Sequence, residues 1–76
     1  MENRYLCFLR NTIKHGIEEL DETYVTLDEF VNEFQHVEGM NGQDPTSLVN
    51  DAKVAVFEAK TKLGLLNDFV REALNE

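Results

Sequence analysis

The sequence predicts an all-α protein in which a helical hairpin packs against a long C-terminal helix. The chain of 76 residues has one proline, and its apolar residues recur at steps of three and four, which is the spacing of amphipathic helices. Strand-like residues are confined to 23–25. A chain of this length forms one domain with a small core. We therefore expect a single domain of three helices, at about residues 3–21, 27–38 and 45–75.

The first predicted helix has one apolar face. Its members are Leu6, Leu9, Ile13, Ile17 and Leu20. Gly16 follows Lys14 and His15, which is typical of a helix C-terminus. The apolar steps nonetheless continue beyond Gly16, which favours a helix to about Asp21, with a bend or a break at the glycine as the alternative.

The second predicted helix follows a short connector over residues 23–25. Thr26 is the expected N-cap, and Glu29 three residues later completes a capping box. The apolar residues of this helix share one face: Leu27, Phe30, Val31, Phe34 and Val37. A loop over residues 39–43 is expected next, because an Asn-Gly pair there favours a turn.

The third predicted helix is the longest and begins with Asp44 as N-cap and Pro45 as its first residue. Its apolar residues fall on a heptad pattern. One heptad position is taken by Val49, Val56, Leu63 and Val70, the other by Ala52, Ala59, Leu66 and Ala73, and the stripe is widened by Leu48, Ala55 and Phe69.

A further line of residues lies about opposite that heptad: Val54, Phe57, Thr61, Gly64 and Leu65. A helix with two apolar faces is usually buried on both. We therefore expect this line to be covered, either by a second copy of the chain in a homodimer built on the third helix or by another protein. The alternative is a set of scattered surface residues, which are common.

The excess negative charge is concentrated in the middle of the chain. The net charge is −8, and ten carboxylates but no Lys or Arg lie between Lys14 and Lys53. This balance argues against nucleic acid or an anionic membrane as a direct ligand. Cys7 is the only cysteine, no stretch is long enough to span a bilayer, and the N-terminus lacks the features of a signal peptide. We expect a cytoplasmic protein.

No cofactor or metal site is predicted. Residues 18–29 superficially resemble a calcium-binding EF-hand loop, but with Glu29 as the last ligand Leu20 would occupy a ligand position and Thr23 the glycine position. The residues that could bind zinc, namely Cys7, His15 and His36, lack the spacing of a zinc site.

Catalysis is not predicted either. A nucleophile such as Cys7 or Ser47 needs an oriented base beside it, and small amphipathic helical chains rarely enclose a pocket. The sequence has no glycine-rich phosphate loop and no basic patch. We therefore expect a protein that is not an enzyme.

The acidic middle remains the candidate binding surface. Its candidate residues are Glu18, Glu19, Glu22, Asp28, Glu29 and Glu33. They form either a solubilising surface or a face that binds a basic surface of another protein, such as a nucleic-acid-binding groove. In charge and size the chain resembles phage-encoded inhibitors of nucleic-acid enzymes. The predicted function is a non-enzymatic regulator or inhibitor, and the alternative is a structural or assembly subunit that uses the long C-terminal helix as its interface.

Overall fold

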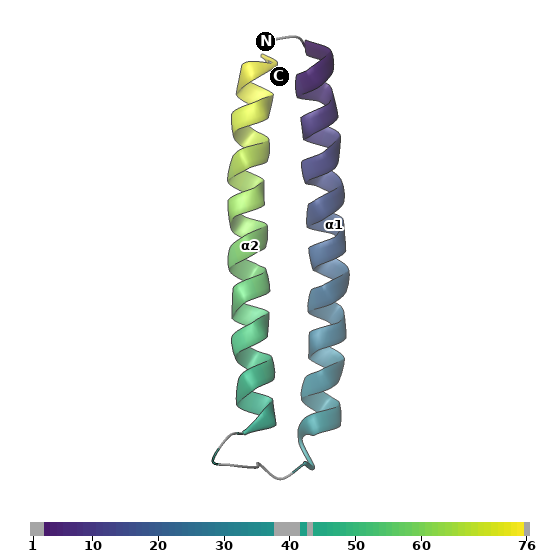
Figure 1. Cartoon of the computed structure of the whole chain (residues 1–76), viewed down its shortest axis with the longest axis vertical. Coiled ribbons are helices and arrows are strands. Elements are labelled where there is room, and N and C mark those ends of the chain that lie inside the picture. Colours follow the sequence, from purple (N-terminus) through teal and green to yellow (C-terminus); the bar gives the residue numbers. More distant parts are fainter. Residues whose placement is uncertain (1–2, 38–41, 43, 76) are drawn as a thin grey trace.

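The protein is a hairpin of two long antiparallel helices. The computed structural model describes residues 3–37, 42 and 44–75, and its helices are α1 (Asn3–Phe34) and α2 (Pro45–Ala73). They lie side by side along their whole length, with the two ends of the chain at the same end of the rod (Figure 1). The rod measures 54 × 17 × 16 Å. The all-α hairpin predicted from the sequence is confirmed, but it consists of two helices instead of three.

The first two predicted helices are one continuous helix, so the connector at residues 23–25 and the N-cap at Thr26 are wrong. The hydroxyl groups of Thr23 and Thr26 donate hydrogen bonds to the carbonyl oxygens of Glu19 and Glu22, at 3.0 and 3.2 Å. Such bonds to the preceding turn are made within a helix. β-Branched residues lower helix propensity only slightly, so packing against α2 decides the conformation here.

The residues of α1 that pack on α2 run without interruption through the expected connector. Tyr24, which falls in the expected connector, is half-buried and lies between Leu20 and Leu27 at steps of four and three. On α1 the contact stripe, meaning the buried and half-buried apolar residues between the helices, consists of Leu6, Leu9, Ile13, Ile17, Leu20, Tyr24, Leu27, Val31 and Phe34. Steps of three and four are typical of two helices in near-antiparallel contact.

Gly16 does not end or break the helix. It lies on the side of α1 that faces α2, and a Cβ atom placed on it would lie 3.6 Å from the Leu63 Cδ1 atom. The small residue therefore sits where a leucine of the opposite helix packs.

Helix α2 begins as the sequence predicts. The Asp44 side chain accepts a hydrogen bond from the Thr46 backbone amide at 3.1 Å, and Pro45 occupies the first turn. Asp44 has an extended backbone, which is the usual conformation of an N-cap. The predicted C-terminus at about residue 75 is close to the observed end at Ala73.

The heptad pattern of α2 is only partly used against α1. On α2 the contact stripe consists of Val49, Val56, Leu63 and Val70, with Ala52 and Ala59 half-buried at its edge, and the C-cap residue Leu74 continues it. Leu66 and Ala73, predicted to share the heptad with these alanines, are exposed. Helix α2 packs against a single helix of the same chain. It therefore buries one narrow face, and its other residues remain in solvent.

The chain between the helices departs from the predicted pattern. The second predicted helix was expected to reach residue 38, but α1 ends at Phe34 and residues 35–37 form a turn. The expected loop over residues 39–43 lies outside the described residues except for Gly42, whose φ of +76° is the left-handed conformation that glycine adopts readily.

The described core is small. Leu6 and Val70 are 7 % and 6 % exposed, and they are the only described side chains classed as buried. Many large apolar side chains are exposed, among them Phe8, Phe57 and Phe69. Within the described part of the chain, neither helix contains a segment apolar enough to cross a membrane.

The continuity of α1 can be tested at Val25, an exposed residue in the middle of the helix. Val25→Pro should lower the free energy of unfolding by about 3 kcal/mol or more, because proline removes a helical hydrogen bond and clashes with the preceding turn. Val25→Ala is the control and should leave stability equal or slightly higher. Thermal unfolding followed by circular dichroism measures both. An unchanged melting temperature for Val25→Pro would show that residues 23–25 form a connector.

Candidate functional site

The predicted acidic residues are concentrated on the outer side of α1. Four of them follow one another at steps of four, seven and four residues, which places them on one helical face. We call this set the acidic row: Glu18, Glu22, Glu29 and Glu33. All four are exposed, and at a rise of about 1.5 Å per residue the row is about 22 Å long.

A histidine lies at the N-terminal end of the acidic row. The His15 Nε2 atom is 3.4 Å from Glu19 Oε1, and its Nδ1 atom is 4.0 Å from Glu18 Oε2. All three side chains are largely exposed. Glu19 therefore lies at the margin of the row, where a protonated His15 would offset part of the negative charge.

Asp28, predicted to belong to the acidic surface, lies instead on the side of α1 that meets two lysines of α2. Lys53 forms an ion pair with Asp28, and Lys60 forms one with Asp21. The two aspartates are seven residues apart, as are the two lysines, so both pairs repeat with the heptad. We call these four residues the charged side of the hairpin. The matching seven-residue spacing is the signal by which the sequence could have revealed them.

Lys53 contacts two residues of α1, Tyr24 and Asp28. Its Nζ atom lies 5.1 Å from the centre of the Tyr24 ring, which is a favourable position for a cation over an aromatic ring. Its hydrogen bond to Asp28 raises the pKa of Lys53 above the ordinary value, while partial burial opposes the shift and the negative charge of Asp28 adds to it. The ammonium group of Lys53 therefore makes its contacts within the hairpin.

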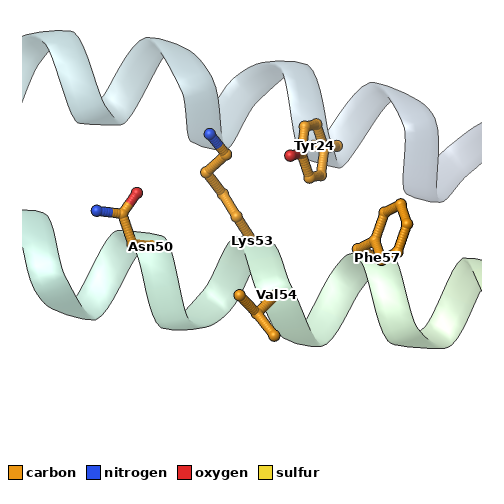
Figure 2. Close-up of a pocket in the computed structure, with 5 residues that line it drawn as sticks. All are labelled: Tyr24, Asn50, Lys53, Val54 and Phe57. Carbon is orange, nitrogen blue, oxygen red and sulfur yellow. The ribbon is translucent and has the colours of Figure 1, made fainter.

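A shallow, open hollow of about 380 Å³ lies beside Lys53. Figure 2 shows Tyr24 on α1 and the other lining residues, Asn50, Lys53, Val54 and Phe57, on α2. The side chain of Lys53 extends toward α1, whereas Val54 points away from it (Figure 2). The hollow is lined by two aromatic rings, one aliphatic side chain, one side-chain amide and the side chain of Lys53.

The predicted partner-binding line of α2 lies on the outside of the hairpin. We call Val54, Phe57, Thr61, Gly64 and Leu65 the outer line. Its three large apolar members are each more than half exposed. The Thr61 hydroxyl donates a hydrogen bond to the Phe57 carbonyl oxygen at 3.1 Å, so its polar group is satisfied within the helix. The outer line is therefore an apolar surface that α1 does not cover.

The geometry of α1 separates the residues of the calcium-like loop. Glu18 and Glu29 are eleven residues apart on one helix, or about 16 Å, whereas ligands of one ion lie within a few ångströms of each other. Among residues 3–37, 42 and 44–75, no group of three or more His, Cys, Asp and Glu side chains is arranged to hold a metal ion.

Calcium, zinc and magnesium at millimolar concentration should therefore leave the melting temperature unchanged. Differential scanning fluorimetry with and without a chelator measures this, with Glu29→Gln as the matched variant. A rise of several degrees in calcium that Glu29→Gln abolishes would contradict the prediction.

The Lys53–Asp28 pair should make stability depend on pH in the alkaline range. Because the folded-state pKa of Lys53 is raised above 10.5, the contribution of the pair is complete below that value and is lost as the pH rises through the folded-state pKa. Denaturant unfolding between about pH 8 and 12 should show a shallower alkaline loss for Lys53→Met than for wild type. Lys62→Met, on an exposed residue, should retain the wild-type slope, and identical slopes for both variants would contradict the assignment.

No protein-family model, curated protein or solved structure matches this chain. Three surfaces of the hairpin are available for binding. These are the acidic row on α1, the charged side with its hollow, and the apolar residues that neither helix covers.

Proposed function

We propose that the hairpin is a non-enzymatic protein–protein interaction module whose acidic row binds a basic surface of a partner protein. One observation carries the proposal. Glu22, Glu29 and Glu33 are exposed on the side of α1 that α2 leaves open, and none of them forms an ion pair with another described residue. Asp21 and Asp28, by contrast, are offset by lysines of α2.

The charge density of the row indicates what kind of surface it suits. Four carboxylates over about 22 Å correspond to about one charge per 6 Å, several-fold below the density of duplex DNA. The row therefore suits a local patch of Lys and Arg rather than an entire nucleic-acid groove. By covering such a patch within a nucleic-acid-binding surface, the hairpin would act as an inhibitor or regulator. Complementary charge of this kind accelerates association and selects the partner.

A structural or assembly role is the second candidate, and the exposed apolar residues of the outer line favour it. Val54, Phe57 and Leu65 offer an aliphatic and aromatic surface with little charge. Binding through this line would be largely insensitive to salt, because burial of apolar surface drives it. Binding through the acidic row would weaken as salt screens the charges.

Charge reversal separates the two roles. The test variant changes three members of the acidic row: Glu22→Lys, Glu29→Lys and Glu33→Lys. The control variant makes the same change in net charge at exposed carboxylates of α2: Asp51→Lys, Glu58→Lys and Glu72→Lys. Asp28 is left intact in both because it pairs with Lys53.

Tagged wild type and the control variant should capture the same partner from a lysate of the source cells, and the test variant should lose it. We expect a reduction of at least about tenfold in affinity, together with release of the wild-type complex as sodium chloride rises. Circular dichroism checks that the helices persist. Equal capture by both variants would show that the row does not bind the partner.

A further inference from the structure

One side of the hairpin carries an apolar surface that neither helix covers. On α2 it follows a second heptad line, interrupted only by Lys62: Leu48, Ala52, Ala55, Ala59, Leu66, Phe69 and Ala73. Leu48 and Leu66 are each 52 % exposed and Phe69 is 72 % exposed. Ala52 and Ala59 are half-buried at the edge of the contact stripe, and the other members lie beside it and are exposed.

This surface lies opposite the charged side. Ala52 and Ala59 each precede a paired lysine by one residue, so they lie about 100° from it around α2. On α1, Phe30 lies two residues after Asp28 and points about 160° away from that carboxylate. The exposed ring of Phe30 forms an edge-to-face contact with Phe34, with centroids 6.1 Å apart.

Aromatic residues from the start of α1 extend the same surface toward the ends of the chain. Tyr5 and Phe8 are both more than half exposed, and their rings stack with centroids 6.5 Å apart. We use the term apolar face for the large exposed residues on this side: Tyr5, Phe8, Phe30, Leu48, Leu66 and Phe69. The acidic row lies on a different side of α1, so covering the apolar face leaves its carboxylates in solvent.

The chain exposes more surface than a compact protein of its mass. The chain exposes 6011 Å², whereas a compact folded monomer of 8.8 kDa exposes about 4,800 Å². The excess is about 1,200 Å² per chain. If two copies each buried this excess, the interface would total about 2,400 Å², which is in the range of obligate homodimers.

We infer that a second copy of this chain covers the apolar face, so that two hairpins form a four-helix bundle. A hairpin whose described core holds two buried side chains has little to stabilise it alone, and chains of this size usually need such support. A second copy is present whenever the chain is made, and it supplies a surface of matching size.

The shape of the apolar face suits a two-fold pair. Its bulky residues lie near the two ends of the hairpin, with Phe69 near the end of α2 and Phe30 near the end of α1 that precedes the loop, while Ala55 and Ala59 occupy the middle of α2. Under a two-fold axis through the middle, bulky ends meet bulky ends and the alanines allow the helices to approach. This inference does not depend on the function proposed for the acidic row.

The first test measures mass in solution. Sedimentation equilibrium and light scattering at about 100 µM should give twice the chain mass of 8.8 kDa. Phe69→Glu should weaken self-association by at least about a hundred-fold, because each dimer would desolvate two carboxylates. Phe57→Glu, at an aromatic of the outer line with similar exposure, should remain a dimer. A wild-type mass of one chain at this concentration would overturn the inference.

The second test does not disturb the fold, because it keeps an aromatic ring at each position. Phe69 or Phe57 is replaced by the photo-reactive p-benzoylphenylalanine, and the purified protein is irradiated. A covalent two-chain product from position 69, absent from position 57, is the expected result. A product from position 57 alone would move the interface to the outer line, and no product from position 69 would likewise overturn the inference.

Discussion

Within one chain, helices α1 and α2 have only each other to pack against, so the contact stripe between them supports every other feature of the hairpin. Its most buried members are Leu6, near the start of α1, and Val70, near the end of α2. Two Lys–Asp pairs repeat along its edge at heptad spacing. Ion pairs at the edge of a helix contact contribute little to stability, so we assign these two pairs to fixing the register. Asn67, whose side-chain oxygen is buried without a hydrogen-bond partner among the described residues, is a polar interruption of the kind that specifies register at a cost in stability.

A single contact stripe also determines how the surface is divided. Residues next to each other in the sequence differ by about 100° around a helix, so Asp28 meets a lysine of α2 while Glu29 belongs to the exposed acidic row. In the same way, Lys53 lies on the charged side of α2 while its neighbour Ala52 lies toward the apolar side. The hairpin thus presents carboxylates, ion pairs and apolar side chains on three different sides, and each side can be altered by substitution with little effect on the other two.

The start of α2 could be predicted because its signal is local: Asp44 and Pro45 define an N-terminus whatever surrounds them. The continuity of α1 could not, because Thr26 and Glu29 satisfy the rule for a capping box equally well inside a helix and at its start. Whether residues 23–26 form a connector or continue the helix is decided by packing, because the contact stripe of α2 runs opposite them. The exposure of the acidic residues could be predicted from their charge. The pairing of Asp28 could not, because it depends on how α1 and α2 are aligned along their length, and the sequence of one helix does not specify that alignment. The exposure of Leu66 depends on how many helices surround α2.

The antiparallel arrangement has a mechanical consequence. Both ends of the chain lie at one end of the rod (Figure 1), so a pulling force applied through them acts across the contact stripe and not along it. The layers of side chains would then separate one after another, beginning near Leu6 and Val70, and the load at any moment would fall on a single layer. A force along the rod would have to break all the layers together. Loaded through its ends, the hairpin should therefore open at low force and close again progressively from the loop.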